Sequence, residues 1–243
     1  MSIERDRANT VIRIRGRIPH RNALVDIGAA GPLAGLFVAL PLIVWGLAHS
    51  EWVDAPPHSG LAFPGDTSLW TLGGAAVHWA LEKLALVPPS TEPPRLFGYQ
   101  ALIFSDSALM RGLKWLVLDT LPAGKDIQEH PVVIAGWFGL LVTLLNLIPV
   151  GQFDGGHLAY ALWGRHARRV GQVMALVLLF LTLFYTVTWA VWCLIATKLV
   201  GFGHPEVTQP QEPLGLGRKL VCGLCFLALA GCAMPVPIRM VIW

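Results

Sequence analysis

The chain has 243 residues, of which 54% are hydrophobic and only 14% are charged, and its mean hydropathy is +0.58. A soluble globular domain carries roughly 25% charged residues, so this balance argues against a soluble fold and predicts an integral membrane protein. The net charge of +3 comes with arginines spread over the segments that flank apolar runs, which argues against a nucleic-acid partner.

The N-terminal part is polar and basic before the first apolar run begins. We expect residues 1–28 to form a cytoplasmic lead-in, in which Val11 to Arg15 alternate in a way that predicts a short β-strand. Residues 29–48 are uncharged and long enough to cross a hydrocarbon core of about 30 Å as a helix. They predict the first transmembrane helix.

Residues 49–130 form a proline-rich connection that cannot be one long helix. The stretch from Leu69 to Leu86 lacks proline and is the best candidate for a short helix within it. Acidic residues outnumber basic ones in this connection. We therefore expect it to be an extracytoplasmic insertion, because cytoplasmic loops carry the excess of lysine and arginine.

The second half of the chain offers three further apolar segments. They are 131–163, which is interrupted, then 170–197 and 220–238, the last two separated by a loop at 198–219. The run at 170–197 has 28 consecutive uncharged residues, more than the core helix of a soluble protein needs. The sequence thus predicts an all-α polytopic membrane protein with about four transmembrane helices.

The basic residues also predict an orientation. Six arginines lie between residues 5 and 21, and Arg165, Arg168 and Arg169 follow the second predicted span. The positive-inside rule places the N-terminus, the 164–169 loop and the C-terminus in the cytoplasm.

A C-x-x-C pair, Cys222 and Cys225, lies within the last predicted span. Such pairs can bind metal or perform redox chemistry. Because this one lies in apolar sequence with no second pair, we interpret both cysteines as small packing residues.

The segment from Asn146 to His157, N-L-I-P-V-G-Q-F-D-G-G-H, interrupts the second predicted span. Pro149 and three glycines should break a helix there, and freed backbone groups cannot face lipid, so the break must face protein or water. A carboxylate at membrane depth is costly unless it is paired or coordinated. Asp154 is therefore a candidate functional residue, although it could also cap a broken helix.

This segment resembles the N-x-x-P-x-x-x-[LF]-D-G-G-H motif of the site-2 protease family of intramembrane zinc metalloproteases, bacterial members especially. Gly31 to Gly35, G-P-L-A-G, is similar to the start of the preceding span in that family. Val11 to Arg15 and the lead-in from Ala23 to Gly28 also resemble the family. The resemblance runs from about Val11 to the third predicted span, and it implies a bacterial inner membrane as the location.

The resemblance implies that Asp154 is the third protein ligand of a catalytic zinc, with two imidazoles and a water completing the site. Asn146 would contact substrate backbone or hold the broken segment, and Pro149, Gly155 and Gly156 would shape the break. The family motif contains the histidine corresponding to His157 but does not use it for metal. The implied activity is hydrolysis of peptide bonds within membrane proteins, so lipid and a transmembrane protein substrate or client are the implied partners.

The sequence departs from the family at the H-E-x-x-H motif, which supplies two zinc ligands and the general base. None of the eight histidines is followed by glutamate or by a second histidine four positions on. We interpret the chain as a truncated protease portion that is inactive alone. Two alternatives remain open: a non-catalytic homologue that binds transmembrane clients, and a small ion- or proton-coupled transporter that uses Asp154.

Overall fold

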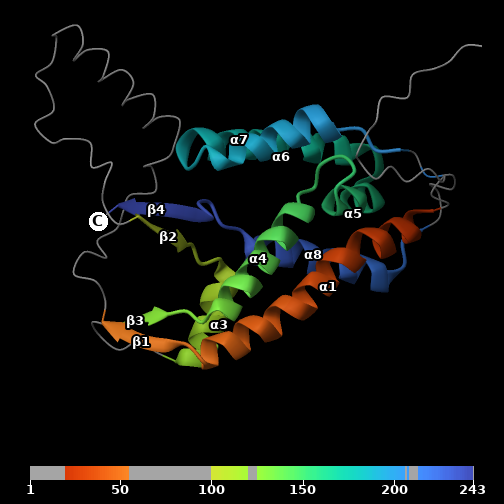
Figure 1. The fold of residues 1–243 in the computed structure, drawn as a ribbon. Coiled ribbons are helices and arrows are strands. Elements are labelled where there is room, and N and C mark those ends of the chain that lie inside the picture. The colour runs from red at the N-terminus through yellow and green to blue at the C-terminus, as the bar shows by residue number, and fades with distance from the viewer. Residues whose placement is uncertain (1–19, 55–99, 120–124, 206, 208–212, 243) are drawn as a thin grey trace, which may run out of the picture.

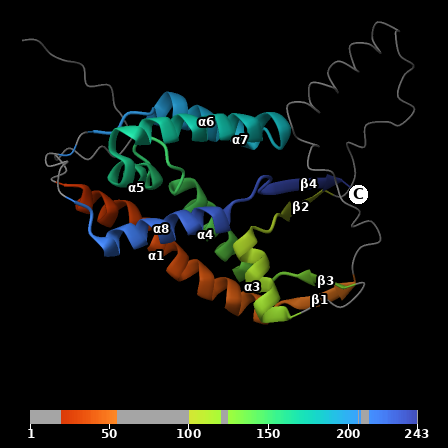
Figure 2. The ribbon, with the colours of Figure 1, turned by 180° about the vertical axis from the view of Figure 1, so that it is seen from behind.

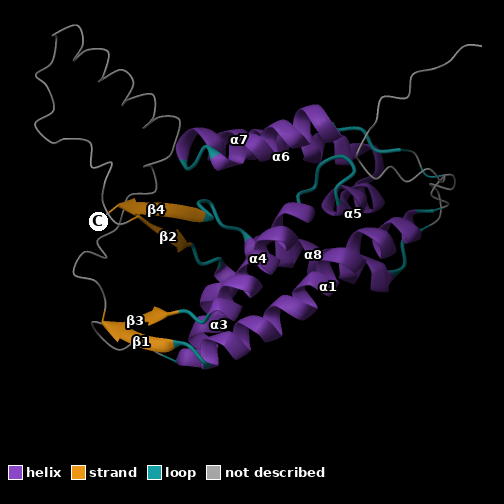
Figure 3. Cartoon of the chain, viewed as in Figure 1, coloured by secondary structure: helices purple, strands orange, loops and turns teal. Residues whose placement is uncertain are grey.

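The computed structural model describes residues 20–54, 100–119, 125–205, 207 and 213–242. Most of these residues are helical, and a few form short strands (Figures 1 and 3). The α-helices are α1 (Arg21–Ala48), α3 (Ala108–Leu118), α4 (Pro131–Asn146), α5 (Asp154–Trp163), α6 (Ala167–Phe184), α7 (Thr188–Leu194) and α8 (Leu216–Cys232). A 3-10 turn (Gly164–His166) precedes α6, and a π-helix (Ile195–Val200) follows α7. The strands are β1 (Glu51–Asp54), β2 (Gln100–Phe104), β3 (Lys125–Gln128) and β4 (Ile238–Ile242).

Small residues bring α1 and α4 together along their length. A Cβ atom at Gly46 would lie 2.7 Å from Val133 Cγ2, and one at Gly139 would lie 2.8 Å from the Cβ of Ala39. Such close contact between backbones is how helices associate where no hydrophobic effect drives them together. The pair forms the centre of the core, in which Trp137 is 1% exposed.

Two helical stretches of the described chain are long and apolar enough to cross a membrane. They are α1, with 28 residues, and the 31 residues of Asp154–Phe184. Only 28% and 22% of their most apolar windows are buried inside the protein, whereas a core helix of a soluble protein would be mostly buried. The first predicted span is found within α1, which begins earlier, at Arg21.

The predicted span at 170–197 is not one helix. After α6 ends at Phe184, the chain turns at Tyr185 and returns along α6 as α7, so the two helices lie side by side (Figures 1 and 2). The Thr188 amide donates to Thr186 Oγ1 at 3.3 Å, a local bond that competes with the helical pattern. Trp189 Nε1 donates to the carbonyl of Pro235 at 2.8 Å and fixes the start of the returning helix. The prediction of a single helix here was wrong.

The hairpin changes the direction of the last helix. Helix α8 begins near the start of α1, where the Arg218 guanidinium donates to both carboxylate oxygens of Asp26 at 2.8 and 2.9 Å. It ends at Cys232, before Pro235 and Pro237, which cannot continue a helix. It is therefore shorter than the predicted span at 220–238.

Two small antiparallel sheets lie at the opposite end of the molecule (Figure 3). Strand β1 pairs with β3, and β2 pairs with β4 in a register that places Phe104 opposite Ile238. The C-terminal strand thus lies beside the 100–104 segment, and the C-terminus lies at the far end from Arg21 (Figure 1). The sequence predicts that both termini share one side of a membrane, whereas Arg21 and the C-terminal strand lie at opposite ends of the molecule (Figure 1). The side of the membrane on which each terminus lies stays a prediction. The predicted strand at Val11 to Arg15 and the candidate helix at 69–86 lie outside the described residues.

Candidate functional site

The predicted break in the second apolar segment is confirmed. Helix α4 ends at Asn146 and α5 begins at Asp154, with seven residues of irregular backbone between them. Leu147 and Val150 in this break are fully buried, and Ile148 is 3% exposed. Local turns satisfy the backbone, since the Val150 amide donates to Ile148 O at 2.8 Å and the Phe153 amide to Val150 O at 3.1 Å. The break is sheltered by protein, as a membrane environment requires.

The glycines of the D-G-G motif fit the first turn of α5 against the break. A Cβ atom at Gly155 would overlap the Leu147 carbonyl oxygen, and one at Gly156 would overlap the Gly151 carbonyl oxygen. Gly151 itself has φ +53°, in the left-handed region that favours glycine. A side chain at Gly155 or Gly156 would push α5 away from the break.

Asp154 is the first residue of α5, and its side chain lies against α1. A Cβ atom at Gly31 would be 3.2 Å from Asp154 Oδ2, and one at Gly28 would be 2.8 Å from the Asp154 carbonyl oxygen. The G-P-L-A-G segment and the D-G-G-H segment, more than a hundred residues apart, therefore meet at this carboxylate. No described residue donates a hydrogen bond to the carboxylate or forms an ion pair with it.

Asn146 directly precedes the break, and Pro149 is the third residue within it. Asn146 is the last residue of α4 and its side chain is exposed, while Pro149 is buried. The carbonyls near the end of α4 accept from backbone amides, such as that of Leu147, which bonds to Thr143 O at 3.0 Å. Among the described residues, no group bonds to the side-chain amide of Asn146.

The Cβ atom of His157 lies against Gly28 of α1, and its ring contacts a histidine that the sequence interpretation did not select. His157 Nδ1 lies 2.7 Å from His204 Nε2, and the His204 ring stacks on Tyr160 with centroids 4.2 Å apart. His204 Nδ1 lies 2.7 Å from the carbonyl of Pro205, so it carries a proton and donates. Burial lowers the pKa of His204, and the bond to Pro205 only partly opposes this. In the bond between His157 Nδ1 and His204 Nε2, one ring nitrogen carries the proton and the other accepts the hydrogen bond.

A zinc site needs more ligands than this arrangement supplies. No group of three or more histidine, cysteine, aspartate or glutamate side chains among the described residues could hold a metal ion. Asp154 supplies one carboxylate, and His157 is paired with His204. Catalytic zinc uses three protein ligands, so the described residues do not by themselves fit this metal.

The C-x-x-C pair fits the packing interpretation. Both Cys222 and Cys225 are thiols with 0% exposure, in a cluster of apolar side chains between α1, α5 and α8. Nothing among the described residues completes a metal site around them.

Comparisons with known proteins give a family match that covers both the G-P-L-A-G segment and the D-G-G-H segment. Residues 4–186 match the family model described as Peptidase family M50. The rice protein "Probable zinc metalloprotease EGY2, chloroplastic" (Oryza sativa subsp. indica) is 27% identical over 207 residues, covering 83% of this chain and 31% of that protein. The protein of the same name from Arabidopsis thaliana is 31% identical over 156 residues, covering 64% of this chain and 21% of that protein.

A third relative extends the match along the chain. "Probable zinc metalloprotease EGY1, chloroplastic" of Arabidopsis thaliana is 24% identical over 238 residues, covering 93% of this chain and 35% of that protein. The chain thus spans about a third or less of the length of these curated relatives. No solved structure matches it.

Proposed function

Because the chain belongs to peptidase family M50, the site-2 protease family of membrane proteins, we propose that it contributes Asp154 to the zinc site of an intramembrane protease. The observation that carries this proposal is the half-buried Asp154 carboxylate, which has no partner among the described residues and lies against Gly31 of α1. The reaction class is hydrolysis of a peptide bond in a membrane protein.

The proposal includes an incomplete site. Water activation by zinc needs a held metal and a positioned base, and H-E-x-x-H, which supplies both in this family, is absent from the 243 residues. We therefore propose that these residues, on their own, neither retain stoichiometric zinc nor cleave a transmembrane peptide. The two imidazoles and the glutamate would come from residues outside this sequence.

On the side of α1, the Asp154 carboxylate meets a glycine, Gly31, and no larger side chain at that position covers it. The exposed amide of Asn146 lies at the other end of the break. An exposed asparagine in this position could bond to the backbone of an extended substrate. We propose this role for Asn146, with a transmembrane protein as the substrate or client.

The location and orientation follow from the basic residues. We propose a bacterial cell membrane with the N-terminus and the 164–169 turn in the cytoplasm, as the excess of arginine at that end favours. The relatives named above are chloroplastic by name. Expression of the chain in a bacterial membrane and in a chloroplast-derived membrane would compare the two settings.

The test is complementation. The purified chain should contain less than stoichiometric zinc by elemental analysis, and co-expression with an H-E-x-x-H membrane segment from a family member should raise both zinc content and cleavage of a transmembrane peptide. Asp154→Asn, which keeps the shape of the side chain but removes its charge, should abolish both gains.

Asp26→Asn is the matched control. It removes a carboxylate at the same end of the molecule and costs only an exposed ion pair, about 0–1 kcal/mol, so it should leave both gains unchanged. Zinc-dependent cleavage by the unaided chain, lost in Asp154→Asn, would show that the missing ligands are within these residues. Equal gains with and without Asp154 would refute its role.

A further inference from the structure

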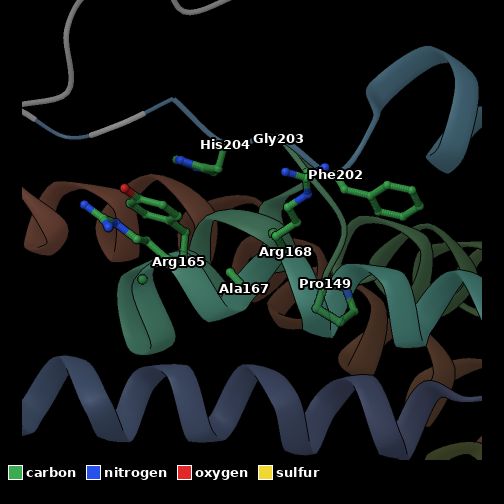
Figure 4. A pocket seen from close by; sticks show the side chains of 11 residues that line it. Pro149, Arg165, Ala167, Arg168, Phe202, Gly203 and His204 are labelled. Atoms are coloured by element: carbon green, nitrogen blue, oxygen red, sulfur yellow. The ribbon is translucent and has the colours of Figure 1, made fainter.

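A pocket of about 400 Å³ lies on the side of α5 away from Gly28 and Gly31. The turn between α5 and α6 forms its floor and the Phe202–His204 segment forms its roof (Figure 4). In Figure 4, Arg168 reaches toward the backbone of Gly203, and Arg165 lies below His204. The proposed zinc chemistry uses none of these side chains.

The pocket is cationic. Arg165 and Arg168 line it, both are exposed, and no described carboxylate pairs with either. Arg21 adds a third guanidinium nearby, because a Cβ atom at Gly164 would lie 3.1 Å from its Nη2 atom. The pocket's described lining contains no aspartate or glutamate. An anion would therefore meet several donors and no repulsion from these residues.

The pocket lies at the end of an apolar surface. On α6, Val173, Leu176, Phe180 and Phe184 share one face and are 60%, 65%, 51% and 55% exposed. This stripe begins one helical turn after Arg169 and extends about 17 Å along the axis at 1.5 Å per residue. In a membrane protein such a stripe faces acyl chains, so the arginines next to its start lie at the level of the lipid headgroups.

We propose that this pocket binds the phosphate group of an anionic phospholipid, with its acyl chains along the exposed face of α6. Arg165 and Arg168 are three residues apart and both line the pocket. Guanidinium groups offer a fork geometry that suits phosphate oxygens. Basic pockets at the cytoplasmic ends of transmembrane helices are typical sites for anionic headgroups. The inference requires insertion in a membrane and does not depend on the zinc site.

The experiment measures binding of soluble short-chain lipids to the full purified chain in neutral detergent by calorimetric titration. Dihexanoyl-phosphatidylglycerol, dihexanoyl-phosphatidylcholine and inorganic phosphate are titrated in parallel. Arg165→Gln and Arg168→Gln should each weaken binding of the phosphatidylglycerol about tenfold, as expected for loss of a charge-assisted hydrogen bond. Arg168→Lys, which keeps the charge without the planar fork, should retain part of the affinity and guards against a variant that fails to fold.

Arg169→Gln is the matched control, because Arg169 is exposed and adjacent but does not line the pocket. It should weaken binding by less than about twofold, since an exposed charge outside the pocket is screened by salt. Equal weakening in all three glutamine variants would show general surface attraction and overturn the pocket. Phosphatidylcholine binding as tightly as phosphatidylglycerol would overturn the anion preference, and inorganic phosphate binding equally well would overturn the lipid assignment.

Discussion

The close contact between Gly155 and the break gives the most direct test of the structure. In Gly155→Ala, the new methyl group would overlap the carbonyl oxygen of Leu147, a residue with 0% exposure. Overpacking of this kind costs about 1–3 kcal/mol, and the backbone atom it meets cannot move aside like the end of a flexible side chain. Alanine also favours a helix over glycine by about 0.5–1 kcal/mol, which offsets part of that cost.

Because the clash is with a backbone atom, we take the upper part of the overpacking range, about 2–3 kcal/mol. Subtracting about 0.5–1 kcal/mol of helix propensity leaves a net loss of stability of about 1–2.5 kcal/mol. For a chain of this size, each kcal/mol shifts the melting temperature by about 2–4 °C, so Gly155→Ala should melt several degrees below the parent. Thermal unfolding in one detergent at one protein concentration, followed by tryptophan fluorescence, measures this difference.

Gly223→Ala is the matched control for the same chemical change. Gly223 lies within α8, where a Cβ atom would meet no described atom within 4 Å. Only the gain in helix propensity applies there, so this variant should be as stable as the parent or more stable. If Gly155→Ala melted like Gly223→Ala, the α5 backbone would not lie against Leu147, and the geometry of the break would be refuted.

Two further predictions concern topology and charge. Single cysteines at Ala167 and Gly203 should react with an impermeant thiol reagent from one face and a cysteine at Gln128 from the other; labelling of Ala167 and Gly203 from opposite faces would disprove the α6–α7 hairpin. Lys114 Nζ lies 2.8 Å from Asp106 and 2.7 Å from Glu129. Replacing Lys114 with methionine should lower the free energy of unfolding by about 1–3 kcal/mol. Burial alone would lower the pKa of Lys114, but the two carboxylates outweigh it and raise the pKa above 10.5. Its contribution is therefore complete below pH 10.5 and lost as the pH rises through the higher folded pKa, so stability in that range should fall in the parent more than in Lys114→Met.

The centre of the site could be predicted from the sequence because its signals are local. Pro149 and the neighbouring glycines break a helix wherever they occur together, and a carboxylate such as Asp154 cannot lie at membrane depth without a reason. The structure confirms the break between Asn146 and Asp154. It also brings Gly31 beside that carboxylate, which the spacing of the motifs along the chain could not show by itself.

The remaining features depend on contacts between distant segments. Nothing in the hydropathy of 170–197 marks the turn at Tyr185, because Thr186 and Trp189 are as compatible with a continuous apolar helix as with a hairpin. The turn depends on the bond from Trp189 to the Pro235 carbonyl, 46 residues away. His204 was missed for the same reason, since its place in the site depends on the hairpin that returns the chain to His157. The only local signal for His204 in the sequence was that a polar residue follows shortly after an apolar run.

The energetics of Asp154 favour a functional interpretation of this carboxylate over a purely structural one. A carboxylate that only capped α5 would be expected to bond to backbone amides or to a cation, yet no described residue does so. The N-terminus of α5 stabilises a negative charge by about 0.3–1 kcal/mol, and up to about 2 in a partly buried site. Placing an uncompensated carboxylate at membrane depth costs several kcal/mol, so the helix end alone does not offset it. Gly31 faces the carboxylate from α1 without a side chain that would cover it, while Gly28 contacts the carbonyl oxygen of Asp154. The proposed zinc site would account for this cost, because a metal ion held jointly with other ligands would supply a positive charge beside the carboxylate.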